Sequence, residues 1–449
     1  MSLSEIVKSQ RDFYNSGNLL SVNKRIDFLK ELRDKIKNSK GEILGAIKED
    51  LGKHNYESFL TEYQVVIGEL EYLINNLHKL ITIKNTGTSL NILPGRGIVL
   101  KKPFGQVLVQ SPWNYPFQLA IIPTIGAIAA GNTVILKTSR KVPQTNNIIK
   151  EITKVLPNEV LYFADDYSHN EILDERYDFY FFTGSRKVGG IIYKKAAENL
   201  APVVLELGGK SPCIVDETAK IKDAVKKIAW GKFLNAGQTC VAPDYVFIHK
   251  KKREEFIDFF KKEINLNYNN RENLTKIITE EKVEQLSSLI KGRNDIYGGE
   301  FNIEDRAFMP TILTNASFDD EIMRDEIFGP ILPIIEYENL SDIIEKVKTK
   351  PSPLALYIFS NKNENVKKIV NYLNFGGGCI NDVIVHVSEI KLPFGGVGGS
   401  GLGNYHGKYS VDTFTHETGV VVSKSGLSNF LRYPPYTEKK FKIIKKVLG

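Results

Sequence analysis

The sequence predicts an α/β protein with a parallel, doubly wound sheet and more than one domain. Short runs rich in β-branched residues alternate with longer helical segments between residues 105 and 209, and this alternation is typical of parallel sheets with helices on both faces. Polar residues follow the ends of several of these runs, where ligands bind in such sheets. The length of 449 residues, about three times that of a usual domain, favours two or three domains.

The predicted elements follow one another in regular order. The strands cover residues 105–111, 133–139, 160–164, 178–184 and 202–209. The helices between them cover residues 117–131, a segment beginning near Pro143, a short stretch before residue 178, and residues 186–200. Further along, residues 224–235 have helical spacing, which places Gly237 and Cys240 in the loop just beyond that helix.

One segment is long enough to suggest a membrane span, but its sequence argues against one. No charged residue occurs from Pro103 to Leu136, but three prolines and several glycines interrupt the stretch. No uninterrupted apolar run approaches the roughly 18 residues that a spanning helix needs. We therefore expect a buried strand, helix and strand here, and no transmembrane span.

Composition and charge indicate a globular protein without a nucleic-acid surface. Hydrophobic residues make up 42% of the chain and charged residues 25%, and the formal net charge is +7. The lysines and arginines are dispersed among acidic residues, whereas nucleic-acid binding requires clustered cations. The N-terminal segment is polar and lacks an apolar leader region, so we expect a cytoplasmic location.

The three cysteines, Cys213, Cys240 and Cys379, lie far apart in the sequence. This spacing argues against a disulfide framework and against a zinc site, and we expect no bound metal. Cys213 lies in a strand-like run and Cys379 in a glycine-rich one, so we interpret both as packing residues. Cys240 stands alone in the loop GQTC, without a histidine in the eight residues on either side.

Stretches with residues suited to ligand binding or catalysis follow four predicted strands: SPWNYP (111–116), KTSR (137–140), TGSRKVGG (183–190) and ELGG (206–209). Gly184 and Gly189 bracket the start of a helix directly after a strand, where backbone amides can meet a diphosphate, although such a pair is often only a tight turn. A G-x-G-x-x-G match ending at Gly401 does not lie between a strand and a helix, and we interpret it as a chance match.

Glu206 is the candidate base for the thiol. A free thiol has a pKa of about 8.5 and needs a cationic, dipolar or basic neighbour to react near neutral pH. Glu206 lies in an apolar strand, where burial should raise its carboxyl pKa towards that of a useful base. A structural ion pair is the alternative role for Glu206, and inert packing is the alternative for Cys240.

Together these motifs resemble the aldehyde dehydrogenase superfamily. LELGGKSP precedes GQTC by 34 positions, and PWNYP, FTGS, EIFGP (326–330) and LPFGGVGGSGLG match in the order and approximate spacing of that family. Details such as GQTCVAPDY, NDVIVH and RYPPY resemble the class 3 branch. The resemblance covers nearly the whole chain and implies a Rossmann-type coenzyme domain, an α/β catalytic domain and a small bridging β-sheet.

The resemblance implies a chemical role for three residues. Cys240 would attack an aldehyde to give a thiohemiacetal, and Asn114 and the Cys240 backbone N–H would hold its oxyanion. After oxidation to a thioester, Glu206 would activate water to release a carboxylic acid. The distant carboxylate thus explains how the thiol functions without a neighbouring histidine.

The resemblance also implies a site for NAD or NADP. Lys137 matches the lysine that contacts the adenosine ribose, and Glu326 the residue that holds the nicotinamide ribose, with Phe328 beside it. Gly184, Ser185 and Gly189 match the turn near the diphosphate and nicotinamide.

Arg140 stands where members of the family commonly have a glutamate. An arginine there favours a 2′-phosphate, so we expect NADP to be used at least as well as NAD. The alternative is an Arg140 side chain that simply points to solvent.

Domain boundaries and partners follow from the same resemblance. The coenzyme-binding domain would comprise residues 1–87 and 103–205, the catalytic domain 206–416, and the bridging segments 88–102 and 417–449. Such a sheet is exchanged between subunits in the family, so we expect a homodimer. The basic, amphipathic tail of the chain would pack in that dimer or contact a membrane surface.

The substrate is a small aldehyde, and class 3 relatives suggest medium-chain aliphatic or aromatic ones. Tyr63, Trp230, Ile384 and Phe394 are candidate walls of an apolar funnel, with core packing as the alternative for each. A reductase that acylates coenzyme A would use the same cysteine but lack the deacylating Glu206. A binding protein without turnover is the remaining alternative.

Overall fold

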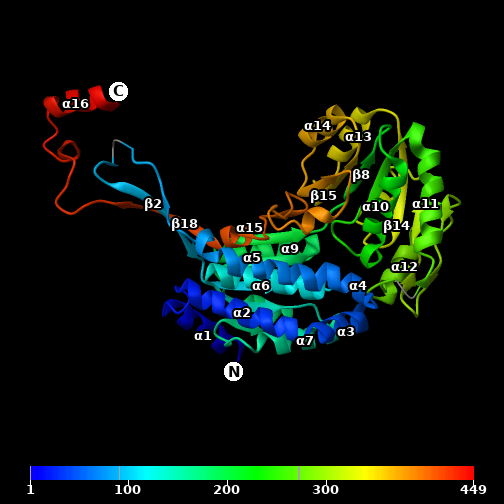
Figure 1. Ribbon diagram of the computed structural model, residues 1–449, viewed down its shortest axis with the longest axis horizontal. Helices are drawn as coiled ribbons and strands as arrows, with labels where there is room; N and C mark the ends of the chain where they lie inside the picture. The colour runs from blue at the N-terminus through cyan, green and yellow to red at the C-terminus, as the bar shows by residue number, and fades with distance from the viewer. Residues whose placement is uncertain (1, 90–91, 272–273, 449) are drawn as a thin grey trace.

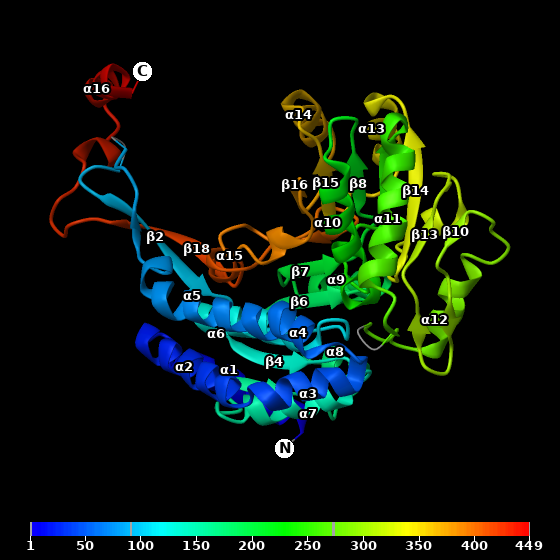
Figure 2. The ribbon, with the colours of Figure 1, turned by 45° about the vertical axis from the view of Figure 1, so that its right-hand side comes forward.

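The computed structural model describes residues 2–89, 92–271 and 274–448. Two sheet-based layers face each other across the molecule, and an arm at the C-terminal end projects from one of them (Figures 1 and 2). The predicted α/β class is confirmed.

The first layer is built on a six-stranded sheet of order β17-β7-β6-β3-β4-β5. Its parallel strands match the predicted series closely. They are β3 (Gln106–Gln110), β4 (Thr133–Lys137), β5 (Leu161–Phe163), β6 (Phe179–Gly184) and β7 (Val203–Leu207). The helices between them are α6 (Pro116–Ala130), α7 (Pro143–Thr153), α8 (His169–Asp174) and α9 (Arg186–Glu198). The charge-free stretch is thus a buried strand, helix and strand, and every residue of α6 is buried.

The sixth strand comes from far along the chain. β17 (Gly401–Leu402) pairs antiparallel with β7, and Gly401 lies opposite Glu206. The G-x-G-x-x-G match therefore ends at a sheet edge rather than between a strand and a helix.

The N-terminal helices cover this first sheet. They are α1 (Leu3–Asn15), α2 (Val22–Asn38), α3 (Lys40–Leu51), α4 (Asn55–Ser58) and α5 (Gln64–Leu80). A π-helical turn, η1 (Phe59–Tyr63), lies between the last two and is followed directly by α5.

The second layer holds a seven-stranded sheet of order β10-β13-β14-β9-β8-β15-β16. Its strands are β8 (Pro212–Val215), β9 (Tyr245–His249), β10 (Ile296–Tyr297), β13 (Thr311–Leu313), β14 (Ile331–Tyr337), β15 (Ala355–Phe359) and β16 (Gly377–Ile380). Its helices are α10 (Ile221–Phe233), α11 (Arg253–Asn267), α12 (Glu280–Ser288), α13 (Leu340–Lys348) and α14 (Asn363–Tyr372), and β11 (Phe301–Asn302) pairs with β12 (Ala307–Phe308) beside them.

The arm begins with a three-stranded antiparallel sheet of order β1-β2-β18. β1 (Lys84–Asn85) and β18 (Thr415–Val422) flank β2 (Arg96–Pro103). The short helix α15 (Lys408–Thr413) leads into β18, and α16 (Glu438–Leu448) ends the arm well away from both layers (Figure 1). A hairpin was expected within residues 88–102. In the structure β2 pairs with β1, which lies just before that range. Residues 90–91 of the expected hairpin lie outside the described residues.

In the described part of the chain, no helix combines the length and apolar character needed to cross a bilayer. The cytoplasmic location and the role of the tail stay predictions.

Candidate active site

Two cavities meet between the layers, and the predicted catalytic residues lie where they join. One cavity of about 490 Å³, called the polar cavity here, is lined by charged and polar as well as apolar groups, and the other, of about 350 Å³, is lined almost entirely by apolar groups. The residues that line both cavities are Leu119, Thr183, Glu206 and Cys240. A molecule in either cavity therefore reaches the same thiol and the same carboxyl group.

A strained loop presents Cys240 at this junction. After α10 the chain makes a short 3₁₀ turn, η3 (Leu234–Gly237), in which Asn235, Ala236 and Gly237 have φ values of 53°, 52° and 73°. Consecutive left-handed residues are costly for side chains with a Cβ and persist only where surrounding contacts hold them. The Gln238 side chain supplies such contacts, because its Nε2 donates to the Asn235 and Lys276 carbonyls at 3.1 and 3.0 Å.

The surroundings of Cys240 keep its thiol protonated. Burial raises the pKa of Cys240 well above its usual range, and the nearby carboxyl groups of Glu326 and Glu206 raise the pKa further. The thiol must therefore lose its proton to another group before it can act as a nucleophile, and Glu206 as that group stays a prediction.

Glu206 is a buried carboxyl group without a partner. It lies on β7, is 3% exposed, and neither of its oxygens has a hydrogen-bonding partner among the described residues. Burial alone raises the pKa of Glu206 well above its ordinary value, as expected. The alternative of a structural ion pair is wrong, because the described residues offer Glu206 no cation within bonding distance. A buried carboxyl group without a partner calls for an explanation, and a role in catalysis is one.

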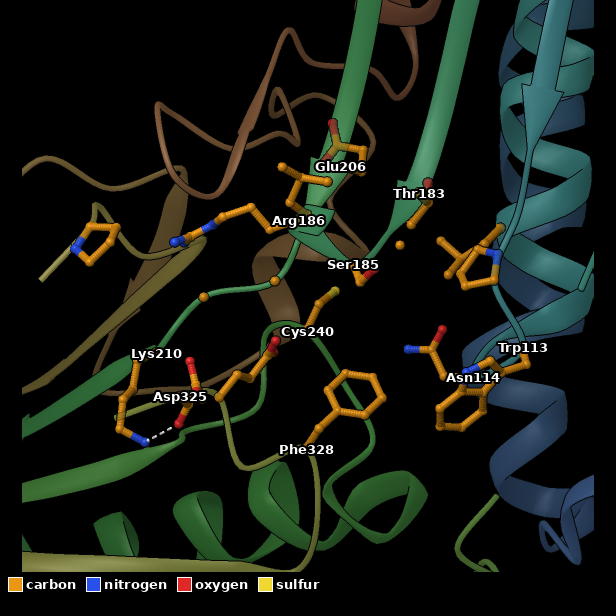
Figure 3. Close-up of a pocket in the computed structure, with 18 of the residues that line it drawn as sticks. Trp113, Asn114, Thr183, Ser185, Arg186, Glu206, Lys210, Cys240, Asp325 and Phe328 are labelled. Carbon is orange, nitrogen blue, oxygen red and sulfur yellow. Dashed lines mark hydrogen bonds between the residues drawn. The ribbon is translucent and has the colours of Figure 1, made fainter. Parts of the chain in front are cut away.

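Asn114 directs its amide into the polar cavity from the loop before α6 (Figure 3). Its Nδ2 donates one hydrogen to the Gln238 carbonyl at 3.0 Å, which ties the amide to the loop of Cys240. An amide nitrogen carries two hydrogens, so the second is available to an oxygen in the cavity.

The polar cavity has the features that a nicotinamide dinucleotide requires. Trp113 and Phe328 pack edge to face with ring centroids 5.6 Å apart and offer aromatic walls. A Cβ at Gly208 would collide with the carboxylate of Glu326, so glycine is needed for this approach. Burial raises the pKa of Glu326 to about 8. Gly184 and Ser185 line the same cavity, where β6 meets α9.

Three predicted coenzyme residues do not line this cavity: Gly189, Lys137 and Arg140. The Gly189 amide donates to the Ser185 carbonyl at 2.9 Å, and the expectation that this turn lies near a diphosphate stays a prediction. Gly189 also allows close packing, since a Cβ there would lie 2.7 Å from Leu207 Cδ2.

Lys137 is the last residue of β4, and Arg140 follows three residues later. The Lys137 ammonium lies 3.4 Å from the Asp165 carboxylate, and burial lowers the pKa of Lys137. The exposed Arg140 guanidinium donates to the Tyr167 carbonyl at 3.1 Å. These two side chains form a separate basic group at the edge of the first sheet.

The apolar cavity contains three of the four predicted funnel residues: Trp230, Ile384 and Phe394. Tyr63 is not one of its lining residues, because it is buried and stacks on Phe59 with ring centroids 5.6 Å apart. Sequence reasoning missed further wall residues, namely Leu60, Thr61, Val65, Val241, Val385 and Val387. Val241 and Val385 lie in the quoted stretches GQTCVAPDY and NDVIVH, whereas the other four carry no local motif.

Comparison with known proteins agrees with this geometry. The sequence pattern of the Aldehyde dehydrogenase family matches residues 2–420. The chain is 40% identical to the 4,4′-diaponeurosporen-aldehyde dehydrogenase of Staphylococcus aureus, covering 96% of each protein. It is 37% identical to aldehyde dehydrogenase family 3 member A2 of Mus musculus, covering 96% of this chain and 91% of that protein.

A solved structure, described as the substrate-bound state of Staphylococcus aureus AldH, superposes with a TM-score of 0.96 at 39% identity, covering 100% of both chains. The family consists of NAD(P)-dependent enzymes that oxidise aldehydes to acids. A thiol and an unpaired carboxyl group between two cavities suit that reaction, and the chain belongs to the aldehyde dehydrogenase family, next to its class 3 members.

Proposed function

We propose that this protein oxidises uncharged medium-chain aliphatic or aromatic aldehydes through a thioester on Cys240. The observation that carries the proposal is the position of Cys240 and Glu206 in the wall shared by a polar and an apolar cavity. The aldehyde enters from the apolar side and the coenzyme from the polar side, and both meet at the thiol.

The first step needs a base because the thiol is protonated at rest. Glu206 accepts the thiol proton and passes it to solvent, and the Cys240 sulfur attacks the carbonyl carbon. The carbonyl oxygen becomes an oxyanion, which accepts hydrogen bonds from the Asn114 amide and the Cys240 backbone N–H. One such donor contributes roughly 10²- to 10³-fold to a rate.

The polar cavity holds NAD or NADP through Trp113, Gly184, Ser185, Glu326 and Phe328. When bound, this coenzyme would supply the hydride acceptor for oxidation of the aldehyde carbon. Glu326 lines this cavity and would orient a ribose, while the aromatic side chains would limit the access of water.

Glu206 then completes the reaction. Its carboxylate removes a proton from water, the resulting hydroxide attacks the thioester carbon, and the sulfur leaves as the carboxylic acid forms. A raised pKa suits this role, because a stronger base removes the proton more effectively. The presence of this carboxyl group disfavours transfer of the acyl group to coenzyme A.

The apolar cavity selects an uncharged aldehyde. Its described lining residues include no lysine, arginine or histidine, so a carboxylated or phosphorylated aldehyde would lose its hydration without a compensating cation. Leu60 and Trp230 are 46% and 39% exposed and form an apolar rim. A chain longer than the cavity can continue across this rim.

Arg140 supports the use of NADP. It follows Lys137 at the end of β4 and leaves its guanidinium exposed to a ligand. An arginine donates to a 2′-phosphate through several N–H groups, whereas a glutamate would repel it.

The arm supports a homodimer. It carries apolar side chains that are at least half exposed in the single chain, namely Val421, Leu427, Phe430, Tyr436 and Phe441. A second copy of the chain would cover this surface, as expected for the bridging sheet.

The test is the absorbance of reduced nicotinamide with purified protein, NADP or NAD, and a panel of aliphatic and aromatic aldehydes without coenzyme A. Reduction in the unaltered protein and none in Cys240→Ala, with coenzyme binding retained, would support the proposal. Reduction only after coenzyme A is added would instead overturn the role of Glu206.

A further inference from the structure

We propose that the buried ion pair of Lys53 and Glu62 positions the oxyanion-binding amide of Asn114. This inference rests on the proposed function, since Asn114 holds the oxyanion there. Neither residue lines a cavity, so both act through the loop between β3 and α6.

The pair is closed off from solvent. Lys53 Nζ lies 2.7 Å from Glu62 Oε1, and both side chains are 0% exposed. Ion pairs at this depth are seldom needed for stability, because well-packed apolar residues serve as well. Their presence beside the active site therefore calls for another role.

Glu62 fixes the beginning of α6. Its Oε2 accepts hydrogen bonds from the backbone amides of Phe117 and Gln118 at 2.9 and 3.4 Å. Tyr115, the N-cap residue of α6, makes no capping bond with its own side chain. A carboxylate from another helix therefore satisfies amides that the first turn leaves unpaired.

Lys53 fixes the residues just before that helix. Its ammonium donates to the Asn114 carbonyl at 3.2 Å and lies 4.2 Å from the centre of the Tyr115 ring. The Asn235 side chain, from the loop that carries Cys240, donates to the same carbonyl at 2.8 Å. The backbone of Asn114 is thus held by the ion pair on one side and by the nucleophile's loop on the other.

The π-helical turn η1 explains how one short segment serves both the pair and the substrate cavity. Leu60 and Thr61 line the apolar cavity, whereas Glu62 is buried against the beginning of α6. A π-turn inserts a residue into a helix and changes the direction of its side chains, and such turns are frequent at functional sites.

The experiment compares a variant in which both charges of the ion pair are neutralised with a variant that lacks the Asn114 side-chain amide. Lys53→Met/Glu62→Gln removes both charges together and retains a carbonyl oxygen to cap α6, so the melting temperature should stay close to that of the unaltered protein. We expect kcat to fall about 10- to 100-fold, as for a catalytic group displaced by about 1 Å. The aldehyde KM and the dissociation constant of the coenzyme should change less than about threefold, because neither residue contacts a ligand.

A double-mutant cycle with Asn114→Ala identifies the route of the effect. If the pair acts through Asn114, adding Lys53→Met/Glu62→Gln to Asn114→Ala lowers kcat no further. Losses that multiply, or an unchanged kcat in Lys53→Met/Glu62→Gln, would overturn the positioning role.

Asp50→Asn is the matched control. The Asp50 carboxylate caps α7 by accepting from the Gln144 and Thr145 amides at 3.1 and 2.7 Å, and Asp50 lines neither cavity at the thiol. Its substitution should lower stability and leave kcat within about twofold, since only a local cap is changed. Absence of turnover in the unaltered protein would overturn the proposed function and this role together, whereas multiplicative losses in an active enzyme would overturn only the role of the pair.

Discussion

At the scale of single residues, burial of the Glu206 carboxyl group lowers the stability of the folded protein and suits the group to its proposed role as a base. In the unfolded chain a glutamate has a pKa of about 4.3, and burial raises the pKa of Glu206 well above this value in the folded protein. Between these two values the folded state retains a proton that the unfolded state has released. The free energy of unfolding therefore decreases as pH rises through this interval.

Glu206→Gln should consequently stabilise the protein above about pH 5, where an unfolded glutamate is ionised. The melting temperature of the variant minus that of the unaltered protein should increase from acidic to neutral pH, because the buried carboxyl group is gone. Thermal unfolding followed by circular dichroism over this range measures the difference. A difference that is constant or shrinks with pH would contradict a raised pKa.

The same proton governs turnover. Because Glu206 would act as a base only when ionised, kcat of the unaltered enzyme should rise with pH above the ordinary range of a glutamate. Glu206→Gln should lower kcat by at least about 100-fold, within the range found for general bases, and remove this rise. Aldehyde and coenzyme at saturating concentrations, with reduced nicotinamide followed by absorbance, provide the measurement. A similar rise in the variant would assign the titration to another group.

Arg140→Glu tests coenzyme preference. The change replaces a guanidinium that can pair with a 2′-phosphate by a carboxylate that repels it. We expect the ratio of kcat/KM for NADP to that for NAD to fall at least about tenfold, equivalent to about 1.4 kcal/mol. An unchanged ratio would mean that Arg140 only contacts Tyr167 and solvent.

The candidate site could be predicted from sequence where its residues follow strands or belong to motifs. Cys240, Glu206 and Asn114 meet these conditions, and all three line the polar cavity. Lys53, Glu62 and Leu60 do not. Lys53 lies in the loop between α3 and α4, and Leu60 and Glu62 lie in the π-helical turn η1, whose sequence resembles any amphipathic helix. Their importance depends on which loop the tertiary fold packs against them.

At the scale of elements, the parallel strands of the first sheet could be predicted because they are buried and mostly apolar. The second sheet was expected only through resemblance, since its strands are scattered over residues 212–380 among surface segments. The π-helical turn η1 had no sequence signal, because one added residue barely changes a helical pattern. The motif predicted a coenzyme contact for Gly189. The structure adds a packing reason for this glycine, because a Cβ there would collide with Leu207 where α9 packs against β7.

The loop of Cys240 should not tolerate a side chain at Gly237. The backbone there has φ +73°, and a Cβ would collide with the main-chain carbonyl of Gly329. Because neither backbone can yield easily, Gly237→Ala should lower the free energy of unfolding by about 1–3 kcal/mol and reduce kcat. Denaturant unfolding and steady-state kinetics measure both effects. Gly45→Ala is the control, since a Cβ there meets no atom within 4 Å.

At the scale of the whole molecule, the arm makes the oligomeric state testable. Its apolar side chains would remain exposed in a monomer, and such surfaces favour association. We expect light scattering after size-exclusion chromatography to give twice the chain mass of 50.7 kDa. Deletion of residues 424–449 should shift the protein towards the monomer. A monomeric full-length chain, or a truncated chain that dimerises equally well, would contradict this prediction.

The position of β17 also has a consequence for synthesis on the ribosome. β7, which carries Glu206, is made about two hundred residues before its neighbour β17, which pairs Gly401 with Glu206. Until the nascent chain reaches that point, the first sheet has an open edge, and open edges invite pairing with other chains. The proposed base, Glu206, is therefore among the last parts of its sheet to be enclosed, and conditions that slow translation of the second layer should increase the need for chaperones.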